Sequence, residues 1–433
     1  MVAGQAPVGS ATVRRPGGHP LTRRSAWVAR LDSPLAPYYL ILGSVIALVV
    51  IGLVMVLSSS NIAALRGSQK DSYAIFAKQA IFAAIGLPLA FVASRIRVSQ
   101  LKALAWPALG VGMLGLIAVA AFGRTTGGNT NWLYIGPVGI QPSEAAKLAL
   151  IVWAAAVLAR KQAMVGQVAH ALIPVVPGAL VLLALVMVGN DLGTALVLVA
   201  ITVALLFTAG VPLRLFAVGG LLGGLAITLL VTTSENRMKR VNTWLGNTPC
   251  EYLSTCWQPT HSRYALATGG WWGVGLGAGR EKWLWLSQAH NDFIFAVIGE
   301  ELGLIGTLTV LALFAALGIG LFKLVIASDD TFVKIATGGV LAWVLGQAII
   351  NIGTVLGMLP VIGLPLPLVS SGGSALVTVM IAFGMVLGFA RQVPGAPEAL
   401  AARPRIAGRT ASVLSRRGTT APTAVNRRRG RAR

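Results

Sequence analysis

The 433-residue chain is strongly apolar and sparsely charged: 55% of its residues are hydrophobic, 11% are charged and its mean hydropathy is +0.77. A soluble domain carries roughly 25% charged residues, so this composition excludes an ordinary soluble enzyme and indicates a surface that largely faces lipid. The net charge of +22 could suggest a nucleic-acid partner. No aromatic-interleaved basic fold accompanies it, however, and we expect no nucleic-acid binding.

Long apolar stretches recur along the chain. A helix needs about 20 mainly apolar residues to cross a bilayer, and the pattern predicts an all-α polytopic membrane protein with about ten transmembrane helices. The expected spans are 37–58, 74–94, 104–122, 143–159, 172–189, 192–210, 214–232, 293–321, 332–353 and 370–390.

Charge divides the chain into a membrane domain, residues 37–392, and two basic tails, residues 1–36 and 393–433. Eleven arginines and a single acid, Glu398, lie between Arg391 and the end of the chain. With ten spans both tails lie on one side, and the positive-inside rule makes that side cytoplasmic. We expect disordered arms that attract anionic lipid headgroups, with docking of other proteins as the alternative.

The longest connection, residues 233–292, falls between the seventh and eighth spans and on the extracytoplasmic side. Connections of this length are usually functional or disordered. This one holds six of the eleven tryptophans of the chain, which suit a membrane interface. Its glycine-rich part, 268–283, does not match the GxxxxGK[ST] phosphate loop, and we expect a tight interfacial turn there instead.

Both cysteines of the chain, Cys250 and Cys256, lie in this outer loop. An oxidising compartment permits a disulfide between them, and two free thiols are the alternative. A metal site that includes His261 lacks an evident fourth ligand, so we expect no metal site there.

A small group of acids lies inside the expected spans or at their mouths, where ionisable groups are costly and therefore functional candidates. They are Glu144, Asp191, Asp292, Glu300 and Glu301. Each also has a structural explanation. Asp191 and Asp292 could cap helices, Glu144 could neutralise Lys147 three residues later, and the adjacent glutamates could be packed polar groups. The residues alone leave these alternatives open.

Five segments, in order, carry a resemblance to a known family: NWLYIGPVGIQPSEAAK (131–147), NDLGTALV (190–197), TGGWWGVGLG (268–277), AHNDFIFAVIGEELGLIG (289–306) and PLPLVSSGGSAL (365–376). The chain resembles the FtsW/RodA, or SEDS, family of cell-wall polymerases over roughly residues 37–392. Within the family, the HNDFIF spelling and the long basic tails look more like the cell-division members than the elongation members.

The resemblance implies a ten-helix peptidoglycan glycosyltransferase that polymerises lipid II at the outer face of the cytoplasmic membrane, at the division septum. It implies a class B penicillin-binding transpeptidase and other divisome proteins as partners. A lipid II flippase and a non-catalytic divisome scaffold are the rival functions. A flippase would use intramembrane charges such as Lys147 and Glu144 along a path between the leaflets, whereas a scaffold would not need Asp292.

The essential acid of the family carries over to Asp292, which the resemblance makes the general base. The resemblance also points to Lys147 and to the basic cluster of Arg237, Lys239 and Arg240. Arg280 and Lys282 are further outer cations that could bind the lipid pyrophosphate or serve as interfacial anchors. No cofactor is required by these residues. A divalent cation such as Mg²⁺ or Mn²⁺ would suit the pyrophosphate, although no carboxylate cluster requires one.

The chain departs from the family pattern in three places. Asn131 stands before Trp132 where Arg is common, Ser371 replaces an aromatic residue, and residues 247–250 replace an Asp-Pro-Trp element. These differences put a substrate role for those positions in doubt and leave Asp292 untouched.

Overall fold

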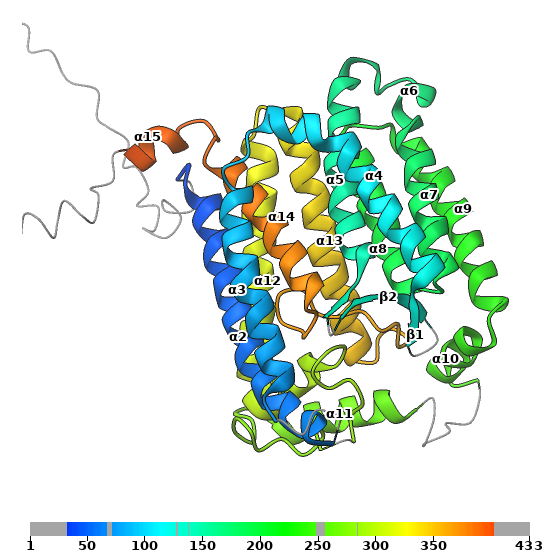
Figure 1. Cartoon of the computed structure of the whole chain (residues 1–433), viewed down its shortest axis with the longest axis vertical. Helices are drawn as coiled ribbons and strands as arrows, with labels where there is room; N and C mark the ends of the chain where they lie inside the picture. The colour runs from blue at the N-terminus through cyan, green and yellow to red at the C-terminus, as the bar shows by residue number, and fades with distance from the viewer. Residues whose placement is uncertain are drawn as a thin grey trace, which may run out of the picture.

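The computed structural model describes residues 33–66, 72–126, 129–136, 138–247, 256–283 and 285–401. They form a bundle of long helices with a small sheet at one end (Figure 1). Residues 1–32 and 402–433, which make up nearly all of the two expected basic tails, lie outside the described residues.

The bundle is built from helices whose bounds follow the expected spans closely. In chain order they are α2 (Ala36–Arg66), α3 (Ala74–Ala93), α4 (Val98–Phe122), α5 (Pro142–Arg160), α7 (Val175–Val188), α8 (Leu192–Thr208), α9 (Leu213–Thr232), α12 (Ile294–Ala327), α13 (Thr331–Val355) and α14 (Ser374–Ala390). Shorter helices connect or flank them: α6 (Val168–Leu172), α10 (Glu235–Leu245), α11 (Trp257–Gly269), α15 (Ala396–Ala401) and the 3-10 turn η1 (Gln162–Met164).

Among the described residues, seven helices are long and apolar enough to cross a membrane. Three more, α7, α8 and α14, are apolar but only 14, 17 and 17 residues long. The prediction of a helical multi-pass membrane protein is confirmed. The expected number of ten requires all three shorter helices to span the bilayer as well.

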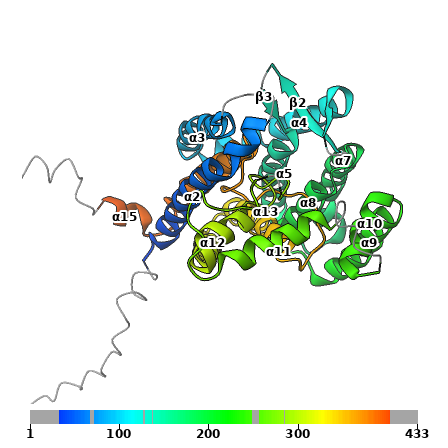
Figure 2. The ribbon, with the colours of Figure 1, turned by 90° about the horizontal axis from the view of Figure 1, so that it is seen from below.

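Helices α5 and α13 form the centre of the bundle, and most residues of each are buried. Around them, α4 packs on α5, α3 on α14 and α2 on α12. Helix α9 differs from all of these, because none of its residues is buried and it packs mainly on α10. Figure 2 shows α9 and α10 at the edge of the molecule.

A three-stranded antiparallel sheet, absent from the sequence prediction, covers the end of α4 and leads into α5. Its strands are β1 (Arg124–Thr126), β2 (Asn129–Ile135) and β3 (Val138–Ile140), in the order β1-β2-β3. The register pairs Thr126 with Asn129 and Ile135 with Val138, so only two residues separate each strand from the next. Pro142 at the first turn of α5 then starts a buried helix where its missing N–H costs nothing.

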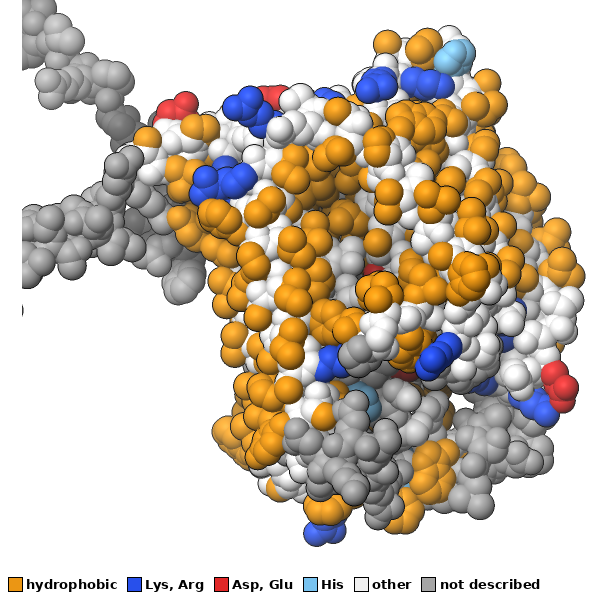
Figure 3. Space-filling model, viewed as in Figure 1, with side chains coloured by type: hydrophobic (Ala, Val, Ile, Leu, Met, Phe, Trp, Pro, Cys, Tyr) orange, Lys and Arg blue, Asp and Glu red, His pale blue; other side chains and the backbone are white. Residues whose placement is uncertain are grey.

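The described chain begins and ends at one end of the bundle, whereas the sheet, α10 and α11 lie at the other (Figure 1). We call the latter the loop end. Hydrophobic side chains cover the face between the two ends, and Lys and Arg side chains gather at its upper and lower rims (Figure 3). That arrangement suits a protein whose middle belt faces lipid.

Residues 356–373, between α13 and α14, fold back into the bundle, and we call them the inward segment. Leu364, Leu366, Leu368 and Val369 are buried there. A Cβ added at Gly52 of α2 would lie 2.7 Å from the Val369 Cα, so that helix touches the backbone of the segment. Helix α14 consequently begins at residue 374 and not at 370 as expected.

Helix α12 is broken near its start at Gly303, whose φ of 66° interrupts the helical backbone. Residues 270–275 fill the break with backbone hydrogen bonds. The Val274 and Gly275 N–H groups donate to the Glu300 and Glu301 oxygens at 2.9 and 3.1 Å, and the Leu304 N–H donates to the Gly270 oxygen at 2.9 Å. The glycine-rich part of the outer loop thus bridges the break in α12. Its backbone pairs with the N–H and carbonyl groups that a broken helix would leave without partners.

Candidate active site

Asp292 lies at the loop end, two residues before α12, as predicted from the sequence. Its expected alternative role as a helix cap is not what the structure shows. The N-cap position is occupied by Phe293, with no side-chain cap bond. The Asp292 Oδ1 is buried and has no hydrogen-bond partner among the described residues. A buried, unpaired carboxylate oxygen is costly, which favours a role in chemistry.

The surroundings of Asp292 favour its protonated form more than water would. Burial raises the pKa of the Asp292 carboxyl to about 6, the positive charge of Arg240 opposes the rise, and the negative charge of Asp191 adds to it. A general base works best with a pKa close to the operating pH. The carboxyl is therefore a stronger base than an ordinary aspartate, yet still largely ionised at neutral pH.

Two of the expected cations, Arg237 and Arg240, come from α10. The Arg240 Nη1 donates to the Val361 oxygen at 3.2 Å, and Arg237 donates to the Asn190 oxygen at 3.3 Å. A Cβ added at Gly363, two residues beyond Val361, would lie 3.5 Å from the Asp292 Oδ2. The same turn of the inward segment therefore borders both Arg240 and Asp292.

Lys239, the third member of the basic cluster, lies in a different environment. Its ammonium is 2.8 Å from the Glu235 carboxylate one turn earlier on α10, and both side chains are well exposed. Such an exposed pair contributes little to stability, so Lys239 remains available to solvent at the loop end.

Asp191 caps α8, as one of its two interpretations predicted. Its carboxylate accepts from the Thr194 N–H at 2.9 Å and the Thr194 hydroxyl at 2.8 Å. The side-chain amides of Asn131 and Gln141 also donate to it, at 3.0 and 3.4 Å. Asn131, which stands where the family commonly has Arg, thus supplies a neutral donor to the buried Asp191 carboxylate. The negative charge of Asp191 in turn raises the pKa of Asp292.

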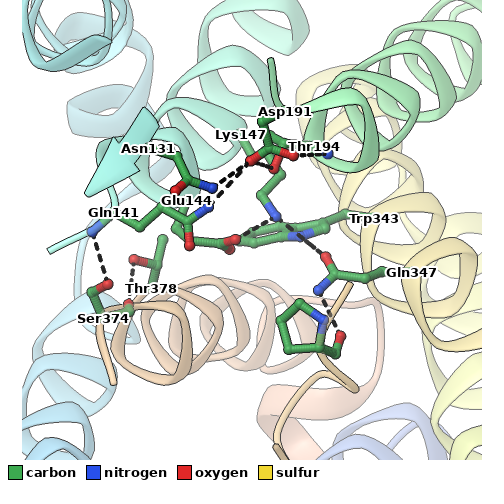
Figure 4. A network of polar contacts seen from close by, with 11 residues as sticks. Asn131, Gln141, Glu144, Lys147, Asp191, Thr194, Trp343, Gln347, Ser374 and Thr378 are labelled. Atoms are coloured by element: carbon green, nitrogen blue, oxygen red, sulfur yellow. Dashed lines mark hydrogen bonds and ion pairs between the residues drawn. The ribbon is translucent and has the colours of Figure 1, made fainter. Parts of the chain in front are cut away.

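Lys147 is fully buried inside the bundle (Figure 4). Its ammonium lies 2.9 Å from the Glu144 carboxylate and 3.2 Å from the Gln347 Oε1, and 5.1 Å above the ring of Trp343. The Gln347 amide in turn donates to the Pro365 oxygen of the inward segment at 2.9 Å. Lys147 and Glu144 therefore form the predicted neutralising pair, and the Gln347 side chain connects this pair to the inward segment.

The structure places Lys282 and Arg280 apart from the α10 arginines. Lys282 is buried, with its ammonium 2.6 Å from the Glu301 carboxylate and 3.0 Å from the Ser58 hydroxyl. Arg280 has an exposed side chain, and its backbone N–H donates to Glu300 at 2.6 Å. Glu300 and Glu301 thus hold the outer loop on α12, in agreement with their interpretation as packed polar groups.

Cys256 takes part in a disulfide, whereas Cys250, its expected partner, lies outside the described residues. His261 contacts the Glu281 carboxylate at 2.6 Å. Across the described part of the chain, no group of three or more His, Cys, Asp or Glu side chains is placed to hold a metal ion.

Sequence reasoning missed three buried polar residues: Asn351 on α13 and Ser370 in the inward segment, which bind the backbone around the candidate base, and Gln347 on α13, which binds Lys147. The two amides are four residues apart, so they lie on one helix face. Buried amides on one face of an apolar span are an available signal, because uncompensated polar groups are costly in a membrane.

Comparison with known proteins identifies the family of this fold and site. Residues 38–394 match the sequence profile of FtsW, RodA and SpoVE, described as a cell cycle protein. The chain belongs to the FtsW/RodA/SpoVE family.

Relatives within the family carry the name of the division type. The probable peptidoglycan glycosyltransferase FtsW of Mycobacterium tuberculosis is 38% identical over 387 residues, which cover 88% of this chain and 72% of the relative. The protein of that name from Thioalkalivibrio sulfidiphilus is 39% identical over 358 residues, 79% of this chain and 87% of the relative. This similarity agrees with the division type predicted from the HNDFIF spelling.

Solved structures share the fold. Thermus thermophilus RodA, a rod shape determining protein, matches with a TM-score of 0.61 and 26% identity over 82% of this chain and 97% of its own. A chain of a peptidoglycan synthase complex, described as coordinating polymerization and crosslinking, matches with a TM-score of 0.67 and 27% identity over 81% of this chain and 97% of its own.

Proposed function

We propose that this member of the family is a peptidoglycan glycosyltransferase that polymerises lipid II into glycan strands at the outer face of the cytoplasmic membrane during septal wall synthesis. The observation that carries the proposal is the Asp292 carboxylate, whose buried Oδ1 has no partner in the described part of the chain and which lies beside a turn that also binds Arg240. The names of the relatives support the same reaction class.

In the proposed reaction, Asp292 takes the proton from a sugar hydroxyl of one lipid-linked disaccharide. The freed oxygen forms a bond to the anomeric carbon of the other, and the bond from that carbon to the polyprenyl pyrophosphate breaks. Base assistance of this kind is worth about 10²–10⁴-fold. The leaving pyrophosphate takes the bonding electron pair, and its negative charge is stabilised by Arg237 and Arg240, which offer fork-shaped hydrogen bonding to phosphate oxygens.

The proposal includes a class B penicillin-binding transpeptidase as partner, together with other divisome proteins. The fold shared with a chain of a peptidoglycan synthase complex supports such a partner. It also includes cytoplasmic termini, which the end of the bundle where the described chain begins and ends supports, because that end lies opposite the sheet, α10 and α11 (Figure 1). A divalent cation at the pyrophosphate belongs to the proposal too, and polymerisation measured with and without EDTA tests it.

The deciding experiment replaces Asp292 by Asn in the full chain, purified with its transpeptidase and supplied with labelled lipid II. The amide keeps the shape of the side chain and cannot accept the proton. We expect normal membrane insertion and partner binding with at least roughly 100-fold slower polymerisation. Glu235→Gln, on the exposed face of α10, is the matched control and should polymerise at the parental rate. Near-normal polymerisation by Asp292→Asn would overturn the assignment.

The same experiment separates the rival functions. A flippase moves lipid II between leaflets without joining two molecules, and a scaffold needs neither lipid II nor Asp292. Polymer is expected only if the parental protein is itself a polymerase, provided that no accompanying enzyme has glycosyltransferase activity of its own. A product-free reaction by protein that still binds lipid II would favour the flippase.

A further inference from the structure

Three consecutive backbone oxygens immediately before α12 are each held by a hydrogen bond. The His290 oxygen accepts from the Ser371 N–H at 3.0 Å. The Asn291 oxygen accepts from the Ser370 hydroxyl at 2.6 Å, and the Asp292 oxygen accepts from the Asn351 amide at 2.7 Å. The backbone that carries the candidate base is therefore bound to two other parts of the fold, the inward segment and α13.

The two side chains involved also bind the inward segment itself. The same Asn351 amide nitrogen donates to the Leu364 carbonyl oxygen at 2.6 Å, and the Ser370 hydroxyl oxygen accepts from the Leu366 N–H at 2.8 Å. Both side chains are almost fully buried. In a medium that excludes water such bonds cannot be exchanged for bonds to solvent, so they fix the relative positions of the parts they join.

The inward segment is anchored on its far side as well. The Gln79 amide of α3 donates to the Ser370 oxygen at 3.1 Å, and its own oxygen accepts from the Gly373 N–H at 3.2 Å. Directly after the segment, the Ser374 hydroxyl at the start of α14 accepts from the Gln141 N–H at 3.1 Å. Ser370 thus connects α3 with the backbone of Asn291: its carbonyl oxygen accepts from Gln79, and its hydroxyl donates to the Asn291 oxygen.

From this geometry we propose that Ser370 and Asn351 are positioning residues, which hold the Asp292 backbone so that its carboxylate meets the sugar hydroxyl in the reactive geometry. The inference rests on the proposed function, in which Asp292 is the base. Since the buried Oδ1 has no partner among the residues that the structure describes, the backbone hydrogen bonds set the position of the carboxylate. A misplacement of about 1 Å at a reacting group can cost on the order of 100-fold in rate.

The test compares two variants with a matched control. Ser370→Ala removes the hydroxyl, and Asn351→Leu removes the amide at similar volume. Thr354→Val is the control, because its buried hydroxyl, on the same helix, donates to the Pro360 oxygen of the inward segment at 3.3 Å and not to residues 290–292. Each protein is purified with its transpeptidase, and its fraction of folded protein is measured by size-exclusion chromatography and thermal unfolding.

We expect Ser370→Ala and Asn351→Leu to lower kcat for lipid II polymerisation by about tenfold or more, with KM changed by less than about threefold. The acid limb of the pH–rate profile should also move to lower pH in these variants, because a carboxylate released from its fixed place gains access to water. A merely structural role would reduce the amount of folded protein and leave both readouts per folded molecule unchanged, as for Thr354→Val.

Two results would overturn the inference, and they are distinguishable. If Asp292→Asn is inactive while Ser370→Ala and Asn351→Leu match the control in kcat and pH profile, the positioning role is wrong and the proposed function stands. If Asp292→Asn polymerises normally, the proposed base is wrong, and the positioning role falls with it.

Discussion

The ammonium of Lys147 lies 2.9 Å from the carboxylate of Glu144, one turn earlier on the same helix, and both side chains are buried. The pair lies in the interior of the bundle, with Lys147 also bound to Gln347 of α13. The arrangement gives Lys147 a structural duty beside the substrate role that the family resemblance implies.

Replacing Lys147 by Met should strongly destabilise the protein, because Glu144 would be left as an uncompensated buried charge. Breaking a buried pair in this way costs about 3–5 kcal/mol. Thermal unfolding in detergent is the measurement. The double variant Lys147→Met, Glu144→Gln should recover most of the loss. If Lys147→Met unfolds at the parental temperature and only fails to bind lipid II, the ion pair is of minor importance and the substrate role prevails.

The rate of polymerisation should fall as the pH drops through about 6, because the base must be ionised and the Asp292 pKa is raised to about 6. At saturating lipid II, Arg240→Gln should move this limb to higher pH, since Arg240 lowers the pKa of Asp292. Asp191→Asn should move it to lower pH, while the amide still caps α8. The pH–rate profiles of the three proteins check the pair of shifts. Shifts in the same direction in both variants would contradict the assignment of the limb to Asp292.

Gly273→Ala should disrupt the backbone hydrogen bonds that bridge the break in α12, because a Cβ at residue 273 would overlap the Glu301 carbonyl oxygen. Gly277→Ala is the matched control: this glycine also has a positive φ, of 83°, but open space around it. We expect the control to lose about 1 kcal/mol from backbone strain, and Gly273→Ala to lose clearly more. Urea or thermal unfolding in detergent measures both. Equal losses would mean that close packing at Gly273 contributes nothing.

The disulfide of Cys256 should join it to Cys250, the only other cysteine in the chain. Mass spectrometry of non-reduced peptides from native membranes should show one crosslinked fragment, which disappears on reduction. Cys250→Ser should yield Cys256 as an alkylatable thiol. Two alkylatable cysteines in the untreated parental protein would refute the bridge.

The membrane architecture could be predicted from the sequence because apolar length and charge distribution determine it directly. The span expected at 332–353 agrees with α13, at Thr331–Val355. The inward segment could not be found in this way, since a short apolar segment with buried leucines cannot be told from part of a buried helix by its composition. Its position depends in part on a hydrogen bond to a residue far away in the chain, from the Gln79 amide of α3 to the Ser370 carbonyl oxygen.

The candidate site was predicted in part for the same reason. Charge and position identified Asp292 only as one of five acids in the spans or at their mouths, and the resemblance to the family singled out Asp292 and the α10 arginines. Asn351 and Ser370 carry no charge, and their importance lies in what their side chains reach across the fold. Lys282 was interpreted as an outer cation from its place in the chain, whereas the structure pairs it with Glu301 in the interior. Sequence order does not reveal such pairing.

The three hydrogen-bonded carbonyl groups before α12 have a consequence for processive synthesis. An enzyme that adds many units to one strand has to advance its product by one repeat after every bond it makes. The backbone of residues 290–292 is bound to α13 and to the inward segment, so it cannot travel with the strand. In such an enzyme the strand would have to move past a base that stays in place.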